Sequence, residues 1–175
     1  MPLDAFLSRP GHLIRRLNQI SVALFLEEIG HLDLTPRQYA ALNMIEVVPS
    51  IDQASLSNLI AMDKTTLVKI IDRLVEKELI TRDRSETDRR TNQLNITDAG
   101  RALLKQVLPL LERSDQRILA PLSRPDQRRF MEMLTQLVHI NNIYSRAPMN
   151  SDMVDGLAAR SASARKAGKA LGKAS

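Results

Sequence analysis

The sequence predicts a mainly α-helical protein with one β-hairpin, in which the N-terminal and C-terminal helices form a dimerisation region. Three observations support this fold class. Helix-start signals recur along the chain, apolar residues follow helical spacing between them, and one charged segment separates two short runs with strand character. The 175 residues, 43% of them apolar and 26% charged, are enough for one globular domain with a dimerisation appendage.

The composition excludes several classes of protein. The chain has no cysteine, so disulfides, thiolate metal sites, cysteine nucleophiles and thiol-based peroxide sensing are excluded. No apolar run approaches the roughly 18 residues that span a bilayer, and the N-terminus lacks the pattern of a signal peptide. We therefore expect a cytoplasmic protein.

The net charge of +5 comes from the C-terminal end of the chain. Residues 156–175 contain five cations and no acid, whereas residues 1–155 carry 20 cations and 20 acids. The body is neutral, so an argument for nucleic-acid binding must come from the local arrangement of charges. We expect residues 151–175 to form a flexible or conditionally helical basic tail that strengthens DNA binding without adding selectivity.

The first predicted helix runs from Pro10 to about Gly30. Its apolar residues form two stripes, whereas a surface helix needs only one. The second stripe predicts burial against another element, such as a second subunit. The stripes are Leu13, Leu17, Ile20 and Leu24, and Val22, Phe25 and Ile29.

A second and a third helix are predicted over residues 35–48 and 53–61. Thr35, Pro36 and Gln38 supply an N-cap, a proline at the first helical position and the glutamine of a capping box. A fourth helix begins after Asp63, which caps it. The residues expected on its buried side are Leu67, Ile70, Ile71, Leu74 and Val75.

Two short strands and two long helices follow. Residues 79–82 and 91–96 have strand character and flank a charged loop, which predicts a hairpin with an exposed tip. Thr97 caps a helix to about Leu119, which Pro109 is expected to bend. Ser123 begins the last helix, whose apolar stripe is Phe130, Leu134, Leu137 and Tyr144.

This order of elements predicts a winged helix-turn-helix, in which the fourth helix enters the major groove of DNA and the hairpin is the wing. We assign residues 34–96 to this DNA-binding lobe, and 1–33 with 97–150 to the helical dimerisation region. Donors near the start of a recognition helix reach base edges or phosphates, and wing arginines enter a narrow minor groove. The candidate DNA-binding residues are Lys64, Thr65, Thr66, Lys69, Arg73, Arg84, Asp88, Arg89 and Arg90.

The wing carries a motif that resembles the MarR family of bacterial regulators. Asp88-Arg89-Arg90, followed by Leu94, Thr97 and Gly100, is similar to the family signature Asp-x-Arg then Leu-Thr-x-x-Gly, although Asn95 and Ile96 intervene. The segment TLVKIIDRLVEKEL, residues 66–79, resembles the family's recognition helix, and the resemblance covers about residues 10–145.

The resemblance implies roles for three residues and an assembly. Arg90 would enter the minor groove with Asp88 as its partner, and Arg73 would contact phosphate. The first, fifth and sixth helices would form a homodimer, with a small-molecule pocket between the dimer region and the DNA-binding lobe. A twofold dimer predicts a pseudo-palindromic operator with half-sites about one helical turn apart.

An anionic effector, such as an aromatic acid or its coenzyme A thioester, would suit arginines near that pocket. The candidate ligand-binding residues are His12, Arg16, Arg37 and Tyr39, with Arg15, Asn18 and Met44 as further lining residues. For each arginine the alternative is a solvated or interface role. The expected function is that of a transcriptional regulator, a repressor that binds a double-stranded DNA operator and is released from it by the ligand.

Two other functions remain open. A constitutive or architectural DNA-binding protein would have no effector, and a protein-interaction scaffold would show no DNA affinity that depends on salt. The sequence has no Gly-rich phosphate loop, Gly-x-Ser-x-Gly elbow or His-Glu-x-x-His motif, so we expect neither an enzyme nor a cofactor. Only His31 has acids nearby, Glu27 and Glu28, and a surface role is preferred to a metal site.

Overall fold

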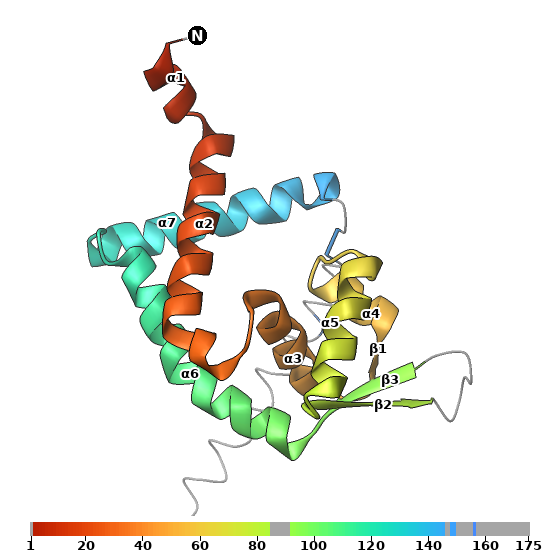
Figure 1. Ribbon diagram of the computed structural model, residues 1–175. Helices are drawn as coiled ribbons and strands as arrows, with labels where there is room; N and C mark the ends of the chain where they lie inside the picture. The colour runs from red at the N-terminus through yellow and green to blue at the C-terminus, as the bar shows by residue number, and fades with distance from the viewer. Residues whose placement is uncertain (1, 85–91, 146–147, 150–155, 157–175) are drawn as a thin grey trace, which may run out of the picture.

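The computed structural model describes residues 2–84, 92–145, 148–149 and 156, and shows a compact lobe beside three long helices (Figure 1). In chain order the elements are α1 (Leu3–Leu7), α2 (Pro10–Ile29), the 3-10 turn η1 (Gly30–Leu32), α3 (Pro36–Val47), β1 (Ile51–Asp52), α4 (Gln53–Leu59), α5 (Lys64–Glu76), β2 (Ile80–Arg84), β3 (Asn92–Ile96), α6 (Asp98–Leu119), α7 (Arg124–Ile140) and the 3-10 turn η2 (Asn141–Tyr144). The predicted mainly helical fold with one hairpin is confirmed.

The helix starts lie where the capping residues predict them. Thr35 and Gln38 form a complete capping box at α3, and Asp63 caps α5. The Thr97 hydroxyl accepts the Gly100 amide at 3.0 Å and begins α6. Each cap satisfies an amide that the helix itself leaves without an acceptor, which fixes where the helix begins.

The lobe is built around one apolar core. Residues of α3, α4, α5 and the sheet fill it, including Leu42, Ile45, Leu56, Leu74 and Leu94, all of them buried. Helix α5, the predicted recognition helix, is therefore held on a rigid support. Val75 was expected on the buried side of α5 but is 37% exposed. At 100° per residue it lies at the edge of the buried stripe, beyond the reach of the core.

The sheet has three antiparallel strands in the order β1-β3-β2. In the hairpin, Arg82 lies opposite Leu94 and Arg84 opposite Asn92. The strands extend two residues further toward the tip on the β2 side than predicted. The sequence analysis missed β1, which pairs Ile51 with Leu94 and ties the wing to the helical part of the lobe.

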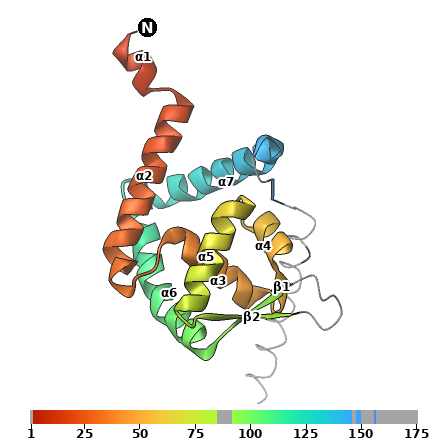
Figure 2. The ribbon, with the colours of Figure 1, turned by 45° about the vertical axis from the view of Figure 1, so that its right-hand side comes forward.

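Helices α2 and α6 pack side by side (Figures 1 and 2). Phe25, Ile29 and Val107 are buried between them. Glu28 accepts hydrogen bonds from Arg117 at 2.9 Å and Arg113 at 3.2 Å. These two guanidinium groups lower the pKa of Glu28. Pro109 lies inside α6, which continues without interruption to Leu119.

Helix α7 has no buried residue, although it carries seven apolar side chains. The predicted stripe is only partly covered: Phe130 and Leu134 are half-buried, whereas Leu137 and Tyr144 are exposed, and Tyr144 lies in η2 beyond the helix. Helix α1, which the sequence analysis did not predict, extends away from the body at the start of the chain (Figures 1 and 2). No helix among the described residues is long and apolar enough to cross a bilayer.

Candidate nucleic-acid interface and effector cavity

The start of α5 is fixed by Asp63. Its carboxylate accepts the Thr66 amide at 2.9 Å, and hydrogen bonds from the backbone and side chain of Thr66 lower the pKa of Asp63. Leu67 and Ile71 anchor the opposite face of the helix in the core. The orientation of α5 therefore follows from one cap and one buried stripe, and its remaining face is directed to solvent.

Three candidate DNA-binding residues lie exposed at the start of this face. They are Lys64, Thr65 and Lys69, while Thr66 is half-buried beside the cap. Within the described part of the chain neither lysine has an ion-pair partner. Two ammonium groups without an ion pair among the described residues, and one hydroxyl, thus lie in the N-terminal half of α5, where they suit contacts to phosphates and base edges.

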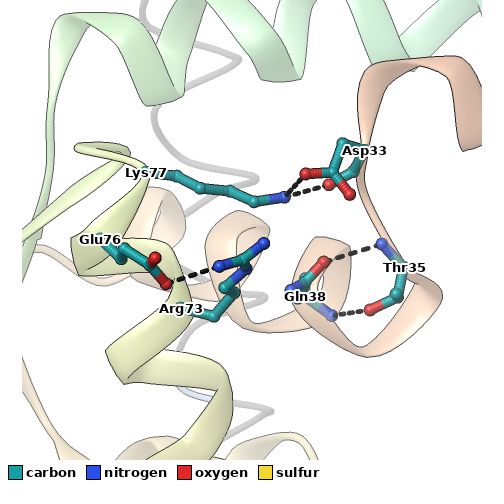
Figure 3. Close-up of polar contacts among 6 residues, drawn as sticks. All are labelled: Asp33, Thr35, Gln38, Arg73, Glu76 and Lys77. Atoms are coloured by element: carbon teal, nitrogen blue, oxygen red, sulfur yellow. Dashed lines mark hydrogen bonds and ion pairs between the residues drawn. The ribbon is translucent and has the colours of Figure 1, made fainter.

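Arg73 lies on another side of α5, toward the start of α3 (Figure 3). Its guanidinium pairs with Glu76 at 2.6 Å, and this carboxylate raises the pKa of Arg73. The side chain remains half exposed. A phosphate contact by Arg73 would thus compete with an intrahelical ion pair, which the i,i+3 spacing of the two residues allows.

A second ion pair on that side joins α5 to the segment before α3. The Lys77 ammonium lies 2.7 Å from the Asp33 carboxylate and also donates to the Asp33 carbonyl (Figure 3). Lys77 lowers the pKa of Asp33, and Asp33 has a positive φ of 52°. These contacts connect the end of the recognition helix to the chain that leaves α2.

The recognition helix and the wing are linked by Asp72 and Arg82. Their carboxylate and guanidinium lie 2.5 Å apart, and the Arg82 side chain is 30% exposed. Asp72 falls outside the buried stripe that the sequence predicts for this helix, but no local pattern predicts its partner. An unpaired carboxylate there would repel DNA, so Arg82 offsets an unfavourable charge on the predicted DNA-binding face.

The wing tip lies partly outside the described residues. Arg84 is exposed at the end of β2. Asp88, Arg89 and Arg90 fall within residues 85–91, outside the described part of the chain, and the same holds for most of the basic tail. Their assignment to DNA continues to rest on the sequence motif.

The candidate effector residues fall into two groups. His12 lines an open cavity of about 590 Å³ together with Arg9, Arg15 and Phe6, whose ring centroid lies 5.0 Å from that of His12. The Nδ1 atom of His12 is buried and has no hydrogen-bond partner among the described residues. Arg16 is exposed outside this cavity lining and donates to Gln19 at 3.4 Å.

Tyr39 and Arg37 belong to the other group, at the start of α3. The Tyr39 ring lies 6.1 Å from that of Phe25, and burial, followed by the charge of Asp115, raises the pKa of Tyr39. His12 and Phe25 are 13 residues apart on α2, which separates them by about 20 Å along the helix. One protomer therefore does not bring the two groups together.

The acids near His31 have other partners. Glu27 and Glu28 both pair with Arg117, at 3.1 and 2.9 Å. Among the residues that the structure describes, no three His, Asp or Glu side chains come together as metal ligands would.

Comparison with known proteins places this architecture among bacterial regulators. Residues 34–91 match the model of the MarR family. Transcriptional regulator HosA of Escherichia coli is 27% identical over 135 residues, covering 77% of this chain and 98% of HosA.

Two solved structures have the same fold. A probable transcriptional regulator from Pseudomonas aeruginosa is 34% identical, with a TM-score of 0.71, over 74% of this chain and 97% of that one. BpsR of Bordetella bronchiseptica, whose DNA binding is regulated by 6-hydroxynicotinic acid, is 26% identical, with a TM-score of 0.72, over 75% of this chain and 94% of that one. With the winged helix-turn-helix and the wing motif, these similarities establish that the chain belongs to the MarR family of transcriptional regulators.

Proposed function

We propose that this protein is a homodimeric repressor that binds a pseudo-palindromic operator and is released from it by a small anionic ligand. The observation that carries the proposal is the solvent face of α5, where Lys64 and Lys69 are exposed and not ion-paired in the described part of the chain. Arg82 meanwhile neutralises Asp72 on the same helix. This arrangement leaves α5 with a net positive surface, and the major groove of B-DNA is wide enough to admit an α-helix.

The dimer is supported by the apolar surface of the long helices. Leu13 and Ile14 on α2 and Leu137, Val138 and Ile140 on α7 are all more than half exposed in one protomer. Apolar surface of this extent marks an interface, and most homodimers have twofold symmetry. We assign residues 1–33 and 97–150 to this interface region and residues 34–96 to the lobe that reads DNA.

An anionic effector is supported by the chemistry of the His12 cavity. Its volume of about 590 Å³ suits a small aromatic acid, and Arg9 and Arg15 offer guanidinium groups to a carboxylate. The unpaired His12 Nδ1 supplies a further polar contact. In BpsR, a relative of the same fold, an aromatic acid regulates DNA binding. The cavity lies beside the apolar dimer surface, so a bound ligand would favour one arrangement of the two protomers.

The proposal predicts a DNA affinity that depends on both sequence and ligand. An operator is first selected from random duplexes with the full-length protein. We expect the selected duplex to bind at least about 1,000-fold more tightly than a random one, measured by fluorescence anisotropy. A thermal-shift screen of benzoates, phenolic acids, hydroxynicotinic acids and their coenzyme A thioesters should then find a compound that raises the melting temperature and weakens operator binding.

Each alternative function gives a different result. A constitutive DNA-binding protein would bind its operator equally well with every compound that raises the melting temperature. A protein-interaction scaffold would show no salt-dependent affinity for any duplex.

The wing assignment predicts the effect of replacing Arg90. We expect Arg90→Ala to weaken operator binding at least tenfold at constant ionic strength, because a dimer loses one minor-groove guanidinium at each wing. The melting temperature should not change. Arg128→Ala removes the same charge from an exposed position on α7, and its affinity should stay within about twofold of wild type. Equal affinity of Arg90→Ala and wild type would refute the minor-groove role.

A further inference from the structure

Val68 is a partly exposed apolar residue at the edge of the solvent face, in the N-terminal half of the predicted recognition helix α5. Its side chain is 43% exposed, and it does not belong to the lobe core or to the partly buried residues that pack against that core. The i+3 and i+4 spacing of a helix places it beside Thr65 and Asp72, and Lys64 precedes it by one turn. The DNA contacts that the sequence predicts on this helix are all polar or charged, so Val68 is not among them.

Helix stability does not account for this valine. A β-branched side chain lowers helix propensity compared with alanine, leucine or lysine, and a side chain that is 43% exposed gains only part of the packing energy of a core residue. The charges around it suit DNA, because Lys64 and Lys69 carry no ion pair among the described residues and Asp72 is paired with Arg82. A valine in such a setting matches the one apolar group on the major-groove edge of B-DNA, the C5 methyl of thymine.

We propose that Val68 determines sequence specificity by packing against a thymine C5 methyl group in each half-site. The proposal rests on the proposed operator binding, and it names a base that one residue reads. Lys64 and Lys69 position the helix on phosphates without selecting a sequence, whereas Val68 distinguishes a T·A pair from a C·G pair, which lacks the methyl group.

A cycle of two changes tests the contact directly. Deoxyuridine differs from thymidine in the pairing base only by the missing C5 methyl. Replacing the selected thymine by deoxyuridine in both half-sites should weaken wild-type binding about fourfold for each half-site, the effect of losing one buried methyl group. Val68→Ser should bind the thymine duplex more weakly, and deoxyuridine should not weaken it further.

Val75→Ser is the matched control. Val75 lies on the same helix, two turns further from the N-terminal end, and is also exposed. Serine and valine have similar helix propensities, so both variants should keep the wild-type melting temperature. Val75→Ser should retain the full deoxyuridine effect. In selections from random duplexes, Val68→Ser should lose the preference for thymine at one position per half-site, and Val75→Ser should keep it.

Each outcome decides between the proposals. An equal deoxyuridine penalty in wild type and Val68→Ser, or the same selected sequence for both, overturns the role of Val68 and leaves operator binding intact. The role of Val68 would also be overturned if light scattering gave Val68→Ser the mass of one chain while its DNA preference stayed unchanged. Val68 would then belong to a protein interface. Failure of wild type to enrich any sequence would overturn the proposed function itself.

Discussion

We expect Gly100→Ala to lower the free energy of unfolding by about 3 kcal/mol or to prevent folding. A Cβ at this position would lie 2.3 Å from the carbonyl oxygen of Leu79 and 2.6 Å from Cγ1 of Ile96. The Leu79 oxygen cannot move away easily, because it accepts a hydrogen bond from the Thr97 amide at 3.1 Å. The Thr97 hydroxyl also donates to the Glu78 carbonyl at 2.8 Å, which holds the same segment in place. Overpacking against backbone of this kind costs about 1 to 3 kcal/mol or more. Urea unfolding followed by circular dichroism measures the change.

Gly11→Ala is the control for this prediction. An added Cβ at Gly11, inside α2, meets nothing within 4 Å. The same substitution should there stabilise the protein by roughly 0.5 to 1 kcal/mol, because alanine loses less backbone entropy in a helix than glycine does. Equal stability of the two variants would contradict the close packing of α6 against the end of α5 and the wing. The glycine of the wing motif would then need another explanation.

The helix starts could be predicted from the sequence because their causes are local. Thr35, Asp63, Thr97 and Ser123 each cap a helix through an amide three residues further along the chain. A pattern of four residues is enough to identify such a bond. The exposed position of Lys69 could be predicted for the same reason, since the apolar spacing of α5 alone determines which residues face solvent.

The remaining features of the candidate interface depend on contacts between distant segments. The pair of Lys77 with Asp33 joins residues 44 apart, and β1 exists only because Ile51 meets Leu94. No local sequence pattern predicts either contact. The separation of the His12 cavity from Tyr39 likewise follows from the length of α2 and from the packing of Tyr39 against Phe25 near its far end. Val68 could be predicted as an exposed apolar residue, since it falls outside the predicted buried stripe of α5.

Loss of the dimer is the other large effect that we expect, and Leu137→Glu should produce it. Leu137 is 56% exposed in one protomer and lies on α7, a helix in which no residue is buried. A glutamate there is compatible with a folded protomer and a stable helix, but in a dimer it would bury a charge without a partner at two symmetric positions. One such charge costs about 3 to 5 kcal/mol. Because about 1.4 kcal/mol is tenfold, the dissociation constant of the dimer should rise at least about 100-fold.

Light scattering at micromolar concentration should give the mass of two chains for wild type and of one chain for Leu137→Glu. Gln136→Glu adds the same charge to the neighbouring, polar position of α7 and should remain dimeric. Operator affinity should fall with the dimer, because a single lobe engages one half-site and loses the high effective concentration of the second. A monomeric wild type, or a Leu137→Glu variant that keeps both its mass and its operator affinity, would show that α7 is not part of the interface. In a protein with an α7 interface, high protein concentration should restore operator binding to Leu137→Glu, since mass action repopulates the dimer without changing the surface of α5 that contacts DNA.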